Sequence, residues 1–287
     1  MKIGIGLPNP VPGVEGRVLV EWARRAEAGG FSTLATIDRL AYPSYESMAV
    51  LAAAAGATER IGLLTNILLA ATRNPVVLAK EAASVYHLSN GRFTLGVGVG
   101  GRADDFDVAK VPFEERGRRM DRMLDLMRRA WRGEAIEGCE SAVNPGPVLE
   151  RGVPLLIGGT SDRAFQRAVE YGIGWTAGGG SPDQVRDSVT RIKEAWKDAG
   201  REGDPHIVAL SYYSLGQGTE DASRRYLLDY YRFLGPHTAG MIADNVPRTR
   251  EAVKETAAAF EDAGFDELVF DPTVAHLDQV DLLATAI

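Results

Sequence analysis

Short β-branched runs alternate with long helical patterns along the whole of this 287-residue chain. The runs that predict strands are 3–7, 34–37, 61–68, 93–97, 155–157, 175–177, 207–215 and 268–270. Patterns that predict helices cover 15–28, 47–57, 113–131, 162–171, 182–199, 220–234, 249–263 and 277–286, and Pro75 opens a further helix. Eight strand–helix units predict an α/β fold of the (β/α)8, TIM-barrel type, with a doubly wound open sheet as the alternative.

The length of the chain fits one folding unit, because α/β barrels commonly reach this size as single domains. We therefore expect one domain over residues 1–287. Residues 133–152 have no clear period and contain several glycines together with Pro145 and Pro147. This segment predicts a short irregular excursion before the fifth strand.

The composition excludes several classes of partner. A net charge of −7 argues against nucleic acid or an anionic membrane surface as the main partner. No apolar run approaches the roughly 20 residues of a membrane span, and a strand pattern from Lys2 leaves no room for a signal peptide. Cys139 is the only cysteine, which excludes an internal disulfide or a cysteine-based zinc site and favours the cytoplasm.

Glycines interrupt the fourth predicted strand, within the stretch HLSNGRFTLGVGVGG at 87–101. Glycine weakens a strand, so Gly96 and Gly98 indicate close approach by a ligand or another backbone. We expect no helix promptly after Gly101, so this stretch does not predict a dinucleotide fingerprint. No such fingerprint follows the first strand either.

Two glycine-rich segments each precede a predicted helix at the catalytic end of the barrel. Gly158-Gly159-Thr160-Ser161 follows the fifth strand, and Gly178-Gly179-Gly180-Ser181 follows the sixth. Free backbone N–H groups at a helix N-terminus bind anions such as phosphate, so both segments are candidate phosphate loops. The alternatives are an ordinary glycine turn with a serine N-cap for the first and a plain flexible loop for the second.

The histidines offer one candidate for catalysis. Active sites of barrels of this type lie at the carboxyl ends of the strands, and only His276, after the eighth strand, can be placed there. A surface histidine at a helix start is the alternative interpretation. No His, Asp and Glu set has metal-ligand spacing, so we expect no metal, and the chain has no GxSxG elbow.

Four segments together resemble the luciferase-like flavin-dependent monooxygenase family, whose members use FMN or the deazaflavin coenzyme F-420. The segments are KIGIGLP, TRNPVVLAKEA followed by HLSNGRFTLGVGVG, FEERGRRMDRMLDLMRRAW, and VPLLIGGTSDRAFQRAVEYGIGW. In this order and spacing they cover most of the chain. The resemblance separately implies a barrel.

The resemblance also implies the cofactor residues. A non-prolyl cis peptide at Asn66–Ile67 would press on one face of the flavin ring. The phosphate loop would be Gly159, Thr160 and Ser161, and the flavin would be lined by Thr176, Gly178 and Gly179. Gly98, near the end of the glycine-rich strand, is also predicted to be a cofactor-binding residue, because the strand opens onto the ligand there.

The chain departs from the family at Asp38-Arg39, where many relatives have an acidic residue followed by a catalytic histidine. Arginine stays protonated and is a poor general base, but it can stabilise an anion. We therefore predict Asp38, Arg39 and His276 as catalytic, with Asp38, His276 or Tyr42 as the general acid. The alternative for Asp38-Arg39 is a structural ion pair at the barrel rim.

The resemblance predicts a flavin-dependent oxidoreductase of the luciferase-like class, foremost an FMN monooxygenase acting on a small organic substrate with a separate flavin reductase. An F-420-dependent reductase or dehydrogenase is the alternative, and a non-catalytic flavin-binding barrel is the third hypothesis. We also expect a homodimer, since relatives commonly dimerise and the helices after strands two and three are small and apolar. The residues concerned are Met48, Leu51, Ala52, Ala55, Val76, Val77, Ala79 and Ala83; covering the barrel wall is their alternative role.

Overall fold

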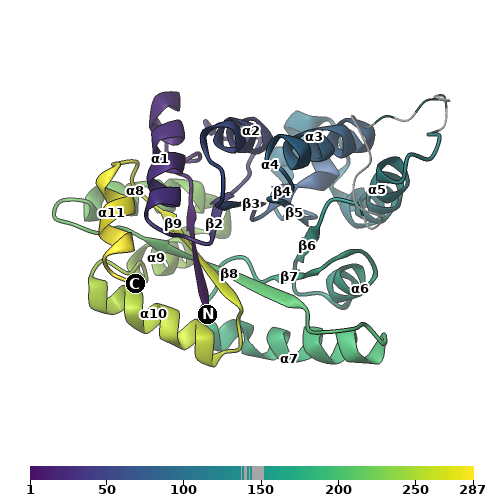
Figure 1. Cartoon of the computed structure of the whole chain (residues 1–287). Helices are drawn as coiled ribbons and strands as arrows, with labels where there is room; N and C mark the ends of the chain where they lie inside the picture. The colour runs from purple at the N-terminus through teal and green to yellow at the C-terminus, as the bar shows by residue number, and fades with distance from the viewer. Residues whose placement is uncertain (137, 139–140, 142, 144–151) are drawn as a thin grey trace.

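The strands of the computed structural model, which describes residues 1–136, 138, 141, 143 and 152–287, form a closed parallel barrel (Figure 1). They are β1 (Lys2–Gly6), β2 (Thr33–Thr36), β3 (Gly62–Thr65), β4 (Leu68–Leu69), β5 (Phe93–Gly98), β6 (Leu155–Gly158), β7 (Gly174–Thr176), β8 (His206–Tyr213) and β9 (Glu267–Pro272). The order is β3-β2-β1-β9-β8-β7-β6-β5-β4, and pairing of β3 with β5 closes the ring. The predicted barrel is therefore confirmed and the open sheet is excluded.

Helices surround the strands on the outside (Figure 1). They are α1 (Gly16–Ala28), α2 (Ser47–Ala57), η1 (Ala70–Thr72), α3 (Pro75–Leu88), α4 (Ala103–Ala109), η2 (Phe113–Glu115), α5 (Arg116–Trp131), α6 (Asp162–Tyr171), α7 (Pro182–Asp198), α8 (Glu220–Tyr230), η3 (Arg232–Leu234), α9 (Pro236–Asp244), α10 (Arg250–Asp262) and α11 (Asp278–Ala284). Most of the predicted excursion over 133–152, with Cys139, lies outside the described residues.

The third strand differs from its prediction as one run over 61–68. It is broken into two short strands, β3 and β4, which both pair with β5. Together they take one strand position, so the nine labelled strands fill the eight positions of the barrel. The break falls at Asn66–Ile67, where the peptide bond is cis, as the resemblance implied.

Two helix predictions were wrong. Helix α4 begins at Ala103, directly after the glycine-rich strand where we expected no helix. Asp104 and Asp105 in its first turn complement the helix dipole and favour this short helix. The predicted single helix over 220–234 ends at Tyr230 instead, and Gly235, with φ of +84°, precedes a separate helix α9.

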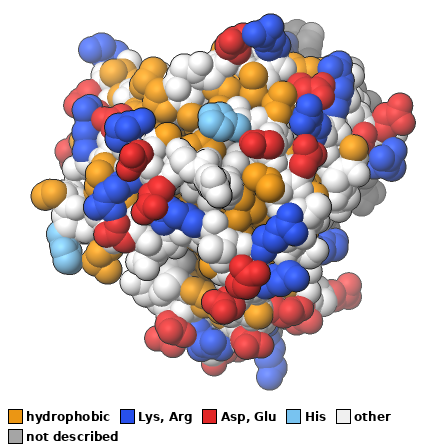
Figure 2. All heavy atoms as spheres, turned by 90° about the vertical axis from the view of Figure 1, so that its left-hand side faces the viewer, with side chains coloured by type: hydrophobic (Ala, Val, Ile, Leu, Met, Phe, Trp, Pro, Cys, Tyr) orange, Lys and Arg blue, Asp and Glu red, His pale blue; other side chains and the backbone are white. Residues whose placement is uncertain are grey.

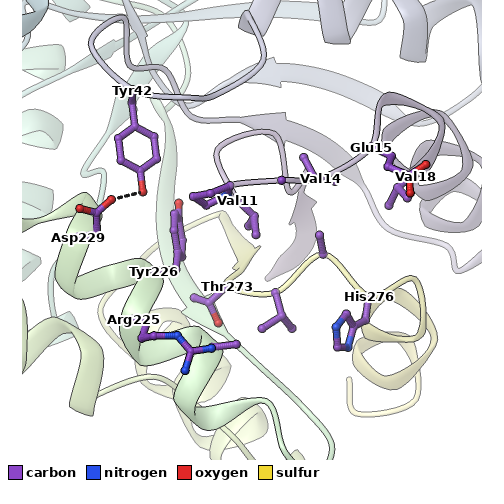
Figure 3. Close-up of a pocket in the computed structure, with 15 residues that line it drawn as sticks. Val11, Val14, Glu15, Val18, Tyr42, Arg225, Tyr226, Asp229, Thr273 and His276 are labelled. Atoms are coloured by element: carbon purple, nitrogen blue, oxygen red, sulfur yellow. Dashed lines mark hydrogen bonds between the residues drawn. The ribbon is translucent and has the colours of Figure 1, made fainter.

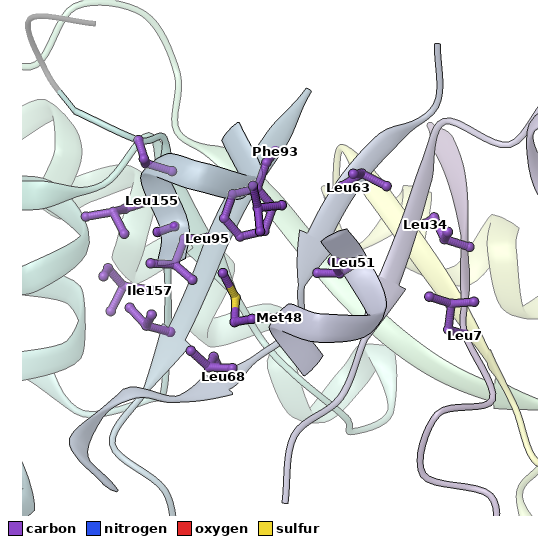
Figure 4. Packing of buried hydrophobic residues seen from close by; sticks show 14 of the residues in the cluster. Leu7, Leu34, Met48, Leu51, Leu63, Leu68, Phe93, Leu95, Leu155 and Ile157 are labelled. Atoms are coloured by element: carbon purple, nitrogen blue, oxygen red, sulfur yellow. The ribbon is translucent and has the colours of Figure 1, made fainter. Parts of the chain in front are cut away.

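The side chains of each strand alternate between the barrel wall and the barrel interior. Wall-facing residues such as Leu63, Leu95 and Leu155 pack with Met48 and Leu51 of α2 in the main hydrophobic core (Figure 4). The interior holds a separate buried cluster, composed of Ala35, Leu64, Leu156, Val208 and Val269. The barrel is thus filled in its middle, and a ligand must bind at one end.

The surface carries mixed charges. Acidic and basic side chains are interspersed on the face shown in Figure 2. Within the described parts of the chain, no helix is long and apolar enough to cross a membrane.

Candidate functional site

The floor of the candidate site lies just beyond the interior cluster, toward the carboxyl ends of the strands. Each residue of the interior cluster is followed, two positions later in the chain, by a residue of this floor. The floor residues are Ile37, Asn66, Gly158, Leu210 and Asp271. This is the end of a parallel α/β barrel at which active sites form. The floor combines apolar, amide and carboxyl groups.

The bulge between β3 and β4 brings predicted cofactor residues together. Asn66 Oδ1 accepts a hydrogen bond from Thr176 Oγ1 at 2.7 Å. The Ile67 side chain lies against β5 and β6, because a Cβ added to Gly98 would come within 1.9 Å of Ile67 Cδ1 and one on Gly158 within 3.2 Å of Ile67 Cγ2. Glycine at 98 leaves this space to the Ile67 side chain, which accounts for a glycine within the strand.

The first predicted phosphate loop is exposed at the N-terminus of α6. Gly159, Thr160 and Ser161 are all exposed, and Ser161 caps the helix by accepting a hydrogen bond from the Ala164 N–H. The Trp175 indole Nε1 donates to the Gly159 carbonyl at 2.7 Å and holds that residue in place. The first N–H groups of a helix have no partner inside it, so the loop is open to an anion.

The second predicted loop precedes α7. Ser181 and Gln184 form a capping box, which satisfies N–H groups at the start of the helix. The Gly178 N–H lies 3.4 Å from Thr176 Oγ1, and the Gly178 carbonyl accepts a hydrogen bond from the Leu210 N–H. Gly179 is exposed. This loop is therefore more fully occupied by its own hydrogen bonds than the first.

Asp38 is buried and acts as a junction between elements. Its two carboxylate oxygens each lie 3.1 Å from the Arg73 guanidinium, and Oδ2 also accepts from the Leu69 N–H at 3.0 Å. Ser47 Oγ lies 3.4 Å from Oδ1. The ion pair considered at the rim thus exists, but Asp38 pairs with Arg73 and not with its neighbour.

Arg39 is also buried, with 1% of its side chain exposed. One guanidinium nitrogen donates to Asp104 Oδ2 at 2.7 Å, and the other donates to the Tyr230 carbonyl at 3.2 Å. Its guanidinium carbon lies 4.8 Å from the centre of the Tyr42 ring. The planar fork therefore links the segment after β2 to α4 and α8 beside the barrel mouth.

His276 lines a cavity of about 500 Å³ beside the mouth (Figure 3). The apolar part of the lining comes from residues such as Val11, Val14, Val18 and Val274. Its polar groups include Tyr42, Arg225, Asp229 and His276.

Tyr42 faces this cavity, but its hydroxyl is already engaged in a hydrogen bond. It donates to Asp229 at 2.8 Å, as the dashed line in Figure 3 shows. Burial and this bond raise the pKa of Tyr42 well above its ordinary value. The hydroxyl therefore stays protonated through neutral pH and does not supply a readily released proton.

An aromatic cover lies over the mouth and was not predicted. Tyr212 of β8 and Tyr231, after α8, join their hydroxyls at 2.7 Å. Arg102 lies against this cover, 4.7 Å from the Tyr230 ring centre and 4.5 Å from that of Phe233. The dense aromatic sequence of α8 and η3 was a signal that could have pointed to it.

Asp271 is a polar floor residue that the sequence reasoning did not select. It is 3% exposed, and neither carboxyl oxygen has a hydrogen-bond partner among the described residues. Its place at the end of the last strand was the available signal, since that end belongs to the catalytic face.

Comparison with known proteins adds the decisive observation. A sequence profile described as luciferase-like monooxygenase matches residues 1–280. The chain belongs to the luciferase-like monooxygenase family. Its place there agrees with the barrel, the bulge and the loop at α6. An uncharacterised family relative from Mycobacterium tuberculosis is 30% identical over 225 residues, which is 67% of this chain and 77% of the relative.

Named relatives of this luciferase-like chain include an F-420-dependent glucose-6-phosphate dehydrogenase from Amycolatopsis mediterranei. It is 28% identical over 77% of this chain and 70% of its own length. The fold is shared with a monooxygenase from Streptomyces bottropensis, at 20% identity, with coverage of 100% and 98% and a TM-score of 0.79. An F-420-dependent secondary alcohol dehydrogenase matches at 19% identity, with the same coverage and TM-score. The family thus contains both monooxygenases and F-420-dependent dehydrogenases.

Metal ligation finds no support in the described residues of this luciferase-like protein. Within them, no group of three or more His, Cys, Asp or Glu side chains is arranged to hold an ion.

Proposed function

We propose that this chain is a flavin-dependent oxidoreductase that acts on a small organic substrate, with FMN as its cofactor and monooxygenation as its reaction. The observation that carries the proposal is the Ile67 bulge, seated on side-chain-free Gly98 and Gly158, next to the exposed helix start at Gly159. These features lie at one end of the barrel.

The residues fit the two halves of FMN. An apolar side chain at 67 suits the face of a tricyclic ring, and the unpartnered Asn66 Nδ2 is a donor available to it. The start of α6 over Thr160 and Ser161 suits a phosphate. Reduced flavin, when bound, supplies the electrons that activate dioxygen or reduce a substrate.

The cavity beside the mouth supports the substrate side of the proposal. Its apolar lining would hold the body of a small organic molecule, and His276 and Arg225 would meet polar groups at its rim. Arg39 and Asp38 would act by shaping the mouth and by the positive charge that Arg39 holds there. A separate flavin reductase would supply reduced FMN, and the single cysteine favours the cytoplasm as the setting.

A deazaflavin-dependent reductase or dehydrogenase is the second candidate. It is favoured by the relatives described as F-420-dependent glucose-6-phosphate dehydrogenases. Parallel titrations with FMN and F-420, together with the mass and absorbance of any co-purified cofactor, separate the two. A cofactor that binds tightly but never turns over with either dioxygen or organic acceptors would favour a non-catalytic flavin-binding barrel.

Replacing Gly159 by valine is expected to weaken FMN binding by about tenfold or more, equivalent to about 1.4 kcal/mol. The valine side chain would occupy the exposed approach to the α6 N-terminus. Flavin fluorescence titration measures the effect. Because Gly159 has φ of +113°, the matched control is Gly203→Val, at φ of +69° in the loop before β8. Equal FMN affinity in the Gly159 variant and the wild type would show that the phosphate binds at another place in the protein.

We also propose a homodimer that uses the outer faces of α2 and α3. Met48, Leu51 and Ala55 are buried within the chain and cover the barrel wall, as are Ala79 and Ala83 of α3. A partner would instead meet exposed small and apolar residues on these two helices, composed of Ala49, Ala53, Gly56 and Val77.

Light scattering is expected to give the mass of a dimer at micromolar concentration. Ala53→Glu is expected to shift it to a monomer, because the new carboxylate would be buried at the contact. Val108→Glu on α4, where the valine is 56% exposed, is the control. A monomer mass for the wild type would contradict the dimer.

A further inference from the structure

Asp271 has an environment that the fold alone does not explain. The residue is buried near the end of β9, and both of its carboxyl oxygens are without a hydrogen-bond partner within the described residues. Buried polar groups in folded proteins are nearly always hydrogen-bonded, so an unsatisfied one requires a specific explanation.

The carboxyl group belongs to the barrel interior, on the catalytic side. Side chains alternate along β9, and Val269 is part of the interior cluster, so Asp271 is the next interior residue toward the mouth. A Cβ added to Gly6 of β1 would come within 1.6 Å of Asp271 Oδ1. The carboxyl therefore occupies space that exists only because residue 6 is glycine.

The opposite end of the same strand provides a contrast. Glu267 is also interior and buried, but its carboxylate accepts from Ser32 Oγ at 2.5 Å and lies 3.1 Å from His206 Nε2. The protein thus satisfies one buried carboxyl of β9 and leaves the other open. The unsatisfied one is at the end where ligands bind.

Burial favours the neutral form of the Asp271 carboxyl. Burial raises the pKa of its carboxyl well above the ordinary value, and within the described chain no cation opposes that shift. The titratable groups around it are Tyr212 and Tyr213 of β8, Tyr226 of α8 and Tyr231. Burial raises the pKa of each of these phenols, so they are uncharged at neutral pH as well.

Several other unsatisfied groups occur at the same end of the barrel, including an amide and a phenol. Asn66 Nδ2, from the bulge, and the Tyr226 hydroxyl, from α8, are buried without partners in the described structure. Each of the three groups comes from a different element. A molecule bound at the mouth would supply partners that the described residues do not, and each group left unsatisfied costs about 1–3 kcal/mol.

We propose that Asp271 binds the ligand of the barrel mouth as a neutral carboxylic acid, donating its hydrogen bond to a carbonyl-type oxygen of that ligand. The inference rests on the proposed function, because the ligand is the flavin or deazaflavin ring system, which carries carbonyl oxygens on its pyrimidine portion. A neutral acid can also accept from a ring N–H, so one side chain can meet both kinds of group.

The test uses the full-length protein, FMN and F-420 as probes, and two variants. Asp271→Leu removes the donor, and we expect about tenfold or greater loss of affinity for whichever probe the wild type binds. Its unfolding temperature should equal or exceed that of the wild type, because an unsatisfied buried group is removed. Thr36→Val is the control, because the Thr36 hydroxyl is also buried and unpartnered but faces the barrel wall.

Asp271→Asn tests protonation without emptying the site. The amide donates at every pH, so Asp271→Asn should keep most of the affinity that Asp271→Leu loses, and the ratio of wild-type to variant affinity should fall only at pH values where the wild-type acid ionises. Equal affinity in wild type and Asp271→Leu, or a ratio of wild-type to Asp271→Asn affinity that rises with pH, would overturn the inference while leaving the proposed cofactor intact. A wild type that binds neither probe would instead overturn the proposed function, and with it this assignment of the ligand.

Discussion

Replacing Asp38 by alanine is expected to lower the free energy of unfolding by about 3–5 kcal/mol, the usual cost of breaking a buried ion pair. The carboxylate holds the Arg73 guanidinium through both oxygens and also accepts from the Leu69 N–H. Its loss would leave a largely buried arginine without its main partner and would free the chain around β4. Chemical denaturation measures the effect.

Glu46 supplies the matched control. It also pairs with Arg73, at 2.7 Å, but its side chain is 46% exposed. Glu46→Ala is expected to cost only about 1 kcal/mol, from an exposed pair and the cap that Glu46 gives to α2. An Asp38→Ala protein with wild-type stability but no activity would contradict the structural role and support direct participation in catalysis.

Replacing Arg39 by alanine is expected to remove most of the turnover, with kcat/KM falling about tenfold to a hundredfold. Hydrogen bonds to charged groups contribute about 1.5–3 kcal/mol, and Arg39 makes such bonds to Asp104 and to the Tyr230 carbonyl. Arg39→Lys keeps the charge but loses the planar fork, so it should retain part of the activity. Steady-state kinetics with the cofactor that binds is the measurement.

The pH dependence defines the role of Arg39 further. Arginine stays protonated in proteins, so Arg39→Ala is expected to lower the activity by a similar factor at each pH. Arg118→Ala, at a side chain 75% exposed on α5, serves as the control. Higher activity in Arg39→His, with a new titration near pH 6–7, would contradict an electrostatic role and indicate proton transfer at this position.

The fold was predictable because its signals are local. Each strand is a short β-branched or glycine-containing run, each flanking helix has its own apolar stripe or proline start, and their alternation determines the barrel. The failures occur where the local pattern is too short or where tertiary contacts decide the structure. The sequence pattern of residues 61–68 does not reveal the bulge, because contacts of Ile67 with β5 and β6 fix its geometry. The start of α4 depends on two aspartates in a helix of seven residues, too short for a periodic pattern.

The site was predictable in place but only partly in chemistry. The strand-end rule and the resemblance selected Asn66 and Thr176, which hydrogen-bond each other across the mouth. They did not predict that Asp38 pairs with Arg73 and Arg39 with Asp104, because these partners are 35 and 65 residues away. The sequence reasoning did not select Asp271, because the sequence alone does not show whether an aspartate at a strand end is exposed to solvent or buried.

The indole of Trp175 gives the protein a built-in optical probe. This ring is buried at β7, and its Nε1 is bonded to the Gly159 carbonyl, so its position is fixed relative to the α6 loop. The remaining tryptophans, Trp22, Trp131 and Trp196, lie on helices α1, α5 and α7 or at their ends. Indole emission overlaps flavin absorption, so energy transfer from Trp175 should report a flavin bound at the mouth when no substrate is present.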